Sequence, residues 1–198
     1  QCDAIPVIAV VTATDNCDTT LTVIPSETAN TVTDGVGSIT REWTVTDQGG
    51  NTTTETQTIT VIDSTDPVLV GVPANTTVQC DAIPVIAVVT ATDNCDTTLS
   101  VTSSETANTV TDGVGSITRE WTVTDQGGNT TTETQTITVI DSTDPVLVGV
   151  PANTTVQCDA IPVIAVVTAT DNCDTTLTVI PSETANTVTD GVGSITRE

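Results

Sequence analysis

The stretch ITREWTV, residues 117–123, carries the clearest structural signal in this sequence. Its side chains alternate, so Ile117, Trp121 and Val123 lie on one face of an extended strand, and that face is expected to be buried. Arg119 shares the face near the start of the strand. We expect its guanidinium to cover the tryptophan or to pair with a local carboxylate, and the alternative is a lock between neighbouring domains.

The same stretch recurs because the sequence repeats with a period of 78 residues, marked by Cys2, Cys80 and Cys158 in the string QCDAIPVIAVVTATDNCD. Trp43 and Arg41 are therefore the counterparts of Trp121 and Arg119, and all four are expected to be structural. Copies this similar indicate recent duplication. A catalytic site needs one copy, whereas a spacer or a multivalent fibre benefits from many.

One complete copy is expected to contain seven short strands, separated by the turn signals DNCD, TDGVG and DQGGN. They are predicted at residues 67–72, 75–80, 84–92, 98–103, 107–111, 115–125 and 130–140. This pattern predicts an all-β fold of tandem immunoglobulin-like β-sandwich repeats in an extended array. The last strand has threonine at alternate positions, which favours cross-strand threonine pairs on a solvent-facing sheet; a regular threonine face also occurs on ice-binding surfaces.

The boundary between repeats is expected at the motif DSTDP, residues 63–67 and 141–145, because proline tends to open the segment that follows an apolar strand. On this interpretation residues 64–141 form a complete repeat. Residues 1–63 form a repeat that lacks its first strands, and residues 142–198 form one truncated before its last strands. Both ends are then expected to be edges of a longer repetitive polymer.

The composition excludes several classes of function. The chain has 26 acidic residues against three basic ones, for a net charge of −23, and it has no histidine or lysine. Such a chain repels nucleic acid and anionic membranes, and no apolar run is long enough to span a bilayer. Its carboxylates are scattered through turns without a paired motif, so no enzymatic activity is expected.

Several longer motifs identify a family resemblance. The runs DPVLVGVPANTTVQCD (66–81), TATDNC (90–95) and ITREWTVTDQGGNTTTETQTITVID (117–141) resemble the hyalin-repeat (HYR) and HYR-like domains. These are immunoglobulin-like modules of bacterial surface proteins, among them the SprB-type motility adhesins of gliding bacteria with type IX secretion. One departure is the last turn, where such repeats often have a cysteine and this chain has Gln126-Gly127.

The resemblance implies an extracellular, cell-surface protein. We expect a non-enzymatic stalk or filament for cell adhesion or gliding motility. Its partners would be neighbouring repeats of the same chain, other copies in a filament, and an unidentified host surface or polysaccharide. The alternative is a carbohydrate- or ligand-binding β-sandwich. Such modules usually display exposed aromatic rings, whereas Trp43 and Trp121 both fall on the predicted core face.

Two cysteines per repeat, in a chain without histidine, favour disulfides over zinc. Periodicity leaves two practical pairings. The favoured one is local, within each repeat: Cys2–Cys17, Cys80–Cys95 and Cys158–Cys173. The other links Cys2 to Cys95 and Cys80 to Cys173 across the junctions between repeats.

No obligatory cofactor is expected, but acidic turns and linkers converge near each junction and suit Ca²⁺. The candidate ligands are Asp63, Asp66, Asp93, Asp96, Asp125, Asn129, Asp141, Asp144 and Asp171. The alternative is that these residues are there to cap and bend the backbone.

The family resemblance also implies O-glycosylation, because Asp18-Thr19-Thr20 and Asp63-Ser64-Thr65 look like the D-[S/T]-[aliphatic/T] signal of these bacteria. The expected glycosylated residues are Thr19, Ser64, Thr97, Ser142 and Thr175.

Overall fold

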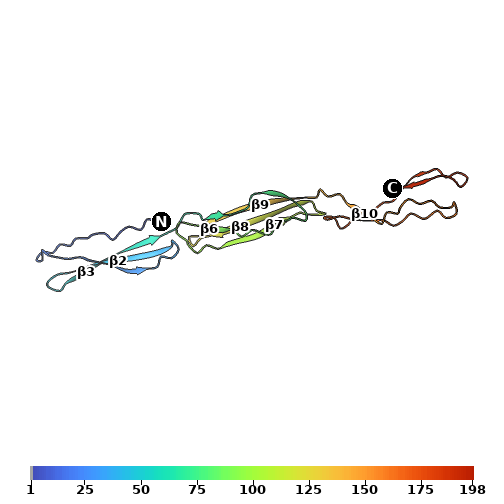
Figure 1. Ribbon diagram of the computed structural model, residues 1–198. Coiled ribbons are helices and arrows are strands. Elements are labelled where there is room, and N and C mark those ends of the chain that lie inside the picture. Colours follow the sequence, from blue (N-terminus) through green and yellow to red (C-terminus); the bar gives the residue numbers. More distant parts are fainter. Residues whose placement is uncertain (1) are drawn as a thin grey trace. The chain divides into compact units, whose positions relative to one another are not determined.

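The computed structural model describes residues 2–198, and the regular elements found there are all β-strands (Figure 1). No helix among these residues is long and apolar enough to cross a membrane. The chain divides into two compact units. One consists of Gln1–Ala74, Ile86–Glu105 and Arg119–Gln135, and the other of Asn75–Val85, Thr106–Thr118 and Thr136–Glu198. The middle repeat therefore contributes to both units.

The first repeat folds into a three-stranded antiparallel sheet in the order β1-β2-β3. Its strands are β1 (Ile24–Asn30), β2 (Gly37–Thr46) and β3 (Thr52–Val61). The TDGVG sequence between β1 and β2 forms a tight turn, closed by mutual hydrogen bonds of 3.0 Å between Thr33 and Val36. Asp34 and Gly35 have positive φ values of 44° and 83° there, which aspartate and glycine tolerate best.

The middle repeat contains two sheets. One has the order β5-β9-β8-β7, and the other pairs β4 with β6. Strand β5 runs parallel to β9, while β4 and β6 are antiparallel. The predicted all-β fold of tandem immunoglobulin-like sandwich repeats is confirmed. The strands are β4 (Val68–Val70), β5 (Thr76–Gln79), β6 (Thr90–Thr92), β7 (Val101–Asn108), β8 (Gly115–Thr124) and β9 (Thr130–Ile140).

The last repeat forms the counterparts of two of these pairings, as its near-identical sequence requires. The pair β10 (Val146–Val148) and β11 (Thr168–Thr170) corresponds to β4 and β6. The pair β12 (Glu183–Asn186) and β13 (Ile195–Arg197) corresponds to β7 and β8.

The alternating stretch ITREWTV, which is part of β8, builds the core. Trp121 is fully buried and packs with Val123, Leu69 and Val89. Its Nε1 donates a hydrogen bond to the carbonyl of Ala87 at 3.1 Å, so the polar edge of the indole is also satisfied. At the other end of β8, Ile117 packs with Ile137 and Val139 of β9.

Trp43 occupies the same position in the first repeat but is half-buried. Its Nε1 donates to the carbonyl of Ala9 at 3.0 Å, which reproduces the hydrogen bond of Trp121. The difference lies in the covering strand, because Leu69 of β4 packs near Trp121 and the first repeat has no counterpart of β4 within these 198 residues.

The arginines pair locally, as the sequence predicts. Arg119 and Arg41 are each 5% exposed, and their guanidinium groups lie 3.7 Å from Glu105 and Glu27, respectively. The expected threonine pairs are also confirmed, with Oγ1–Oγ1 distances of 3.0 Å for Thr122 and Thr132 and 2.8 Å for Thr124 and Thr130.

Three strand predictions are wrong. The predicted strands 98–103 and 107–111 are one strand, β7, and residues 109–114 form the turn that follows it. The predicted strand 84–92 pairs only over Thr90–Thr92. Residues 84–89 have the composition of a buried strand, yet Val85 is 88% exposed and Val88 94% exposed. Ala87 and Val89 face the core beneath them, so alternation persists there without a hydrogen-bonded neighbour strand.

Replacing Trp121 by alanine should lower the free energy of unfolding by about 3–5 kcal/mol, because the truncation leaves a cavity in the best-packed part of the chain. The matched variant Trp43→Ala should cost clearly less, since that indole is only half-buried. Urea denaturation followed by circular dichroism measures both. Equal losses for the two variants would contradict this account of the core.

Candidate functional site

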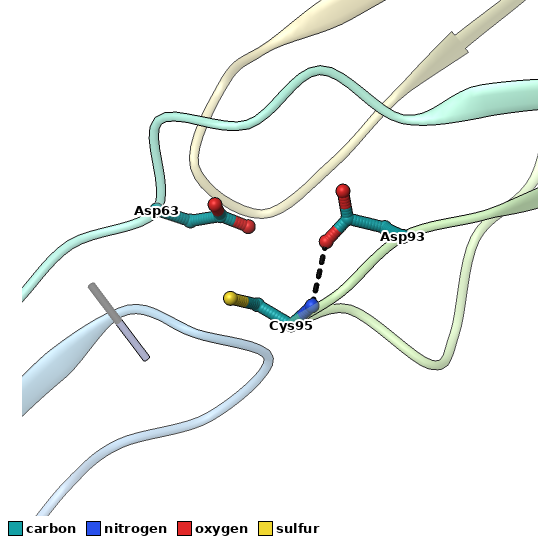
Figure 2. Close-up of side chains that lie close together, drawn as sticks. All are labelled: Asp63, Asp93 and Cys95. Carbon is teal, nitrogen blue, oxygen red and sulfur yellow. Dashed lines mark hydrogen bonds between the residues drawn. The ribbon is translucent and has the colours of Figure 1, made fainter. Parts of the chain in front are cut away.

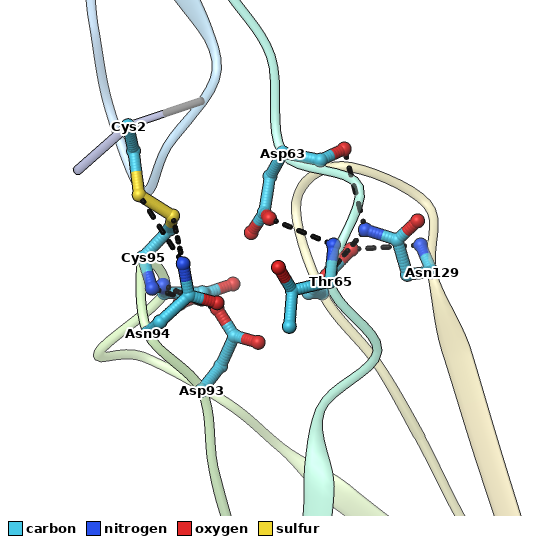
Figure 3. The surroundings of a disulfide bond; sticks show 9 residues. Cys2, Asp63, Thr65, Asp93, Asn94, Cys95 and Asn129 are labelled. Atoms are coloured by element: carbon cyan, nitrogen blue, oxygen red, sulfur yellow. Dashed lines mark hydrogen bonds between the residues drawn. A yellow bond between two sulfur atoms is a disulfide. The ribbon is translucent and has the colours of Figure 1, made fainter. Parts of the chain in front are cut away.

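Disulfides join consecutive repeats at equivalent positions. Cys2 bonds to Cys95 and Cys80 bonds to Cys173, and each bond closes a sequence separation of 93 residues. The Cα–Cα distances are 5.9 Å and 5.8 Å, within the ordinary range for a cystine. In both bonds the first cysteine of one repeat pairs with the second cysteine of the next one. Figure 3 shows the Cys2–Cys95 bond and its surroundings.

The favoured local pairing, Cys2–Cys17, Cys80–Cys95 and Cys158–Cys173, is therefore wrong, and the alternative across the junctions is the one observed. Local pairing required the chain to curl back between the two cysteines of a repeat. A turn does begin there, with the amide of Ala82 donating to the carbonyl of Gln79 at 3.0 Å, but residues 82–89 then continue without regular hydrogen-bonded structure. Cys17 and Cys158 are exposed free thiols.

The tight turn of the preceding repeat lies directly against the cystine. A Cβ placed on Gly35 would lie 2.5 Å from the Cβ of Cys95 and 3.3 Å from that of Asp63, so glycine is required for space as well as for its positive φ. Gly113 stands in the same relation to Cys173 and Asp141. Sequence reasoning recognised these residues as part of a turn but missed their contact with the disulfide.

Further polar contacts tie the same segments together. The hydroxyl of Thr98 donates to the carboxylate of Asp34 at 3.2 Å. The side-chain amide of Asn94 lies 2.9 Å from the sulfur of Cys95 and 3.7 Å from that of Cys2 (Figure 3). The junction therefore combines a covalent bond with contacts from the turn on one side and the DNCD segment on the other.

Two of the predicted calcium ligands, Asp96 and Asp125, accept hydrogen bonds at both carboxylate oxygens. Asp125 accepts from the backbone amide and the side-chain amide of Asn129, both at 2.8 Å. Asp96 accepts from the amide of Thr98 at 2.7 Å and, through its other oxygen, from the amide of Gln126 at 3.1 Å. Because both oxygens of each carboxylate already have donors, these residues fix the turns. Asp66 and Asp144 are exposed in the linkers.

Asp63 and Asp93 are arranged differently. Each uses Oδ1 for the backbone: Asp63 accepts from the amide of Thr65 at 3.1 Å, and Asp93 accepts from those of Cys95 and Asp96 at 2.8 Å and 3.0 Å. Their Oδ2 atoms are buried and have no hydrogen-bond partner. Figure 2 shows the two carboxylates facing each other beside Cys95.

The same arrangement recurs in the next junction. Asp141 accepts from the amide of Thr143 at 3.0 Å, and Asp171 accepts from that of Cys173 at 2.8 Å. The Oδ2 of Asp171 is again buried without a partner.

Turn amides lower the pKa of Asp93 and of Asp171. Burial raises the pKa of Asp93, but the amides of Cys95 and Asp96 outweigh that effect, and the pKa lies below its usual value. For Asp171, donation from the amides of Cys173 and Asp174 is the leading cause, and it lowers the pKa against a smaller effect of burial.

All five residues predicted to carry glycans are exposed: Thr19, Ser64, Thr97, Ser142 and Thr175. Their modification stays a prediction. The hydroxyl of Ser142 also accepts a hydrogen bond from the side chain of Gln79 at 2.8 Å.

The two indole rings offer little exposed aromatic surface. Trp121 is fully buried, Trp43 is half-buried, and the sequence contains no other aromatic residue. Among the described residues, the cystines and the buried carboxylate oxygens without hydrogen-bond partners all lie at the two junctions.

Comparison with known proteins places these observations in a family. Residues 2–61 and 68–139 match the family described as "HYR-like domain with 4 cysteines". Each matched range of this chain contains two cysteines. A search of curated proteins finds no match.

Peptide mapping under non-reducing conditions should recover the cystines Cys2–Cys95 and Cys80–Cys173, and it should find Cys17 and Cys158 alkylated as free thiols. In the chain-entropy relation a loop of 93 residues corresponds to about 4–5 kcal/mol, so reduction should lower the unfolding free energy by a similar amount for each bond. Recovery of a Cys80–Cys95 cystine from folded protein would overturn this assignment.

Proposed function

Because this chain belongs to the family of HYR-like domains with four cysteines, we propose that it forms the repetitive stalk of an extracellular adhesin, in which cystines join consecutive repeats. HYR-like repeats are extracellular, non-catalytic modules of the adhesion type. The pairing of cysteines between repeats is the observation that carries the proposal, because a stalk must transmit force from one repeat to the next.

The two cystines create a covalent route that bypasses most of the chain. A pull on Cys2 passes through its disulfide to Cys95, runs back along the chain to Cys80, and passes through the second disulfide to Cys173. This route contains 15 peptide units, whereas the main chain from Cys2 to Cys173 contains 171. Most of the sandwich, including its core strands β8 and β9, lies off the route.

Residues 80–95, the segment through which the force passes, can extend only a little beyond the length of a folded repeat. Fifteen peptide units extend to about 50 Å at most. Strand β9, with 11 residues, already spans about 36 Å. A stalk repeat of that length could lengthen only slightly before the segment becomes taut, and further force would then act on covalent bonds rather than on the hydrogen bonds of the sheets.

The structure of residues 80–95 suits this role. Over 82–89 the segment makes no regular sheet pairing, so tension along that part breaks no ladder of hydrogen bonds. The paired part of the segment is the short strand β6, which lies next to β4. Its attachment to the core is through side chains: Val89 is 7% exposed, and the carbonyl of Ala87 accepts from Trp121.

The likeness of the repeats to those of motility adhesins supports a place on the cell surface, in adhesion or gliding. The acidic composition supports the same proposal, because a net charge of −23 in 198 residues keeps neighbouring stalks soluble and apart.

Single-molecule stretching from the two ends of the chain tests the proposal. With the cystines intact, the segment from Cys2 to Cys173 should extend to about 60 Å and no further, because the two cystines add Cα–Cα spans of 5.9 Å and 5.8 Å to the 15 peptide units. After reduction it should extend to about 580 Å. The contour length at forces that unfold β-sandwiches is the measurement.

The matched control is Cys17→Ser/Cys158→Ser, which removes two cysteines outside the route and should leave the oxidised contour length unchanged. The variant Cys80→Ser/Cys173→Ser should lengthen it, because the route must then follow the main chain from Cys95. A stalk function is refuted if oxidised wild type already extends as far as reduced protein.

A further inference from the structure

The junction contains two carboxylates whose outer oxygens are buried and accept no hydrogen bond. The buried Oδ2 atoms of Asp63 and Asp93 have no hydrogen-bond partner, and Asp63 as a whole is 7% exposed. Ligand atoms of Asp63, Asp93 and Cys95 all lie within 4.8 Å of one another. Buried carboxylates this close repel each other strongly unless a cation or a shared proton lies between them.

The basic side chains of the protein are engaged elsewhere. The sequence contains three, all arginines, and each lies next to a glutamate on the neighbouring strand: Arg41 with Glu27, Arg119 with Glu105, and Arg197 with Glu183. No arginine is therefore available to balance Asp63 and Asp93, and a cation from solution would do so.

The chemistry of the available ligands restricts which ion fits. Cys95 is oxidised to a cystine, so it offers no thiolate, and zinc and other thiophilic metals lose their preferred ligand. Carboxylate oxygens remain, together with backbone carbonyls and water. A site of this kind, built on turns and with irregular geometry, suits Ca²⁺ better than Mg²⁺, which demands near-octahedral coordination and releases its water reluctantly.

We propose that Asp63 and Asp93 bind one Ca²⁺ beside the Cys2–Cys95 disulfide, and that Asp141 and Asp171 bind another beside Cys80–Cys173. The ion joins the linker that carries the first aspartate to the turn that carries the second. Each pair of aspartates lies beside its own cystine. In both pairs the Oδ1 atoms accept hydrogen bonds from turn amides, which leaves the Oδ2 atoms for the ion.

Only some of the acidic residues at the junction are expected to bind the ion. Asp96 and Asp125 lie in neighbouring turns and are equally buried, at 6% exposed, but backbone and side-chain donors already satisfy their oxygens. They shape the turns and bind no ion. With two protein carboxylates per ion, the affinity should resemble that of extracellular calcium modules, with a dissociation constant on the order of 10⁻⁴–10⁻³ M.

Calorimetric titration of the oxidised 198-residue chain with CaCl2, after removal of metal by EGTA, tests the proposal. We expect two binding sites per chain and a rise in melting temperature of roughly 4–8 °C at saturating calcium, because an ion that binds only the folded chain stabilises it. MgCl2 at the same concentration should give a clearly smaller rise.

Isosteric variants locate the site. Asp63→Asn/Asp141→Asn should abolish both the heat of binding and the calcium-dependent rise in melting temperature, while asparagine Oδ1 can still accept from the turn amides. The control Asp66→Asn/Asp144→Asn makes the same charge change in the same exposed linkers and should bind calcium as wild type does. Asp93→Asn/Asp171→Asn gives a second, independent loss, and circular dichroism with peptide mapping confirms that each variant is folded and correctly paired.

Two results would overturn the proposal. One is a wild-type chain whose melting temperature does not respond to calcium, which would mean that the carboxylates share a proton or are neutralised by sodium. The other is calcium binding by Asp63→Asn/Asp141→Asn that is as tight as wild type, which would place the ions elsewhere. Neither result bears on the stretching experiment, because the covalent route between repeats does not depend on an ion.

Discussion

The cystine between consecutive repeats is the constraint around which the junction is organised. It brings the DNCD turn of one repeat against the TDGVG turn of the preceding one, so closely that a glycine is required at Gly35 and again at Gly113. The same bond places Asp93 near Asp63 and removes the sulfur of Cys95 from any metal chemistry. The pairing of Cys2 with Cys95 thus determines both the mechanical connection and the kind of ligand that the junction can offer.

The different roles of the acidic residues follow from the number of hydrogen bonds that each carboxylate oxygen accepts. A carboxylate in a turn is stable when nearby amides donate to both of its oxygens, as Asp96 and Asp125 show. A carboxylate with one satisfied oxygen and one buried, unsatisfied oxygen carries a cost that must be met from outside the chain. In a protein with three basic side chains, all next to glutamates, protein groups cannot meet that cost.

Much of the fold was predictable because it depends on local alternation. The buried position of Trp121, the pairing of Arg119 with a nearby carboxylate and the threonine pairs all follow from the period of two along a strand. The disulfides were not predictable in the same way, because an exact repeat makes a partner within the repeat and one in the next repeat equally periodic. The apolar composition of residues 84–89 was misleading for a related reason. Apolar side chains are needed there to cover Trp121, but they do not indicate whether the backbone of this segment pairs with a neighbouring strand. Sequence position alone also could not separate Asp63 from Asp125, since both lie in acidic loops and differ only in how many donors surround them.

The two disulfide loops overlap, since Cys80 lies inside the loop closed by Cys2 and Cys95. Every peptide bond between Cys2 and Cys173 consequently has an alternative covalent path around it. A protease that cuts once anywhere in this region, in an exposed turn or in the valine-rich segment, leaves the two ends of the protein joined. An extracellular polymer built this way tolerates isolated cleavage without being severed. Its two ends separate only after three cuts, one in each of the segments 2–80, 80–95 and 95–173.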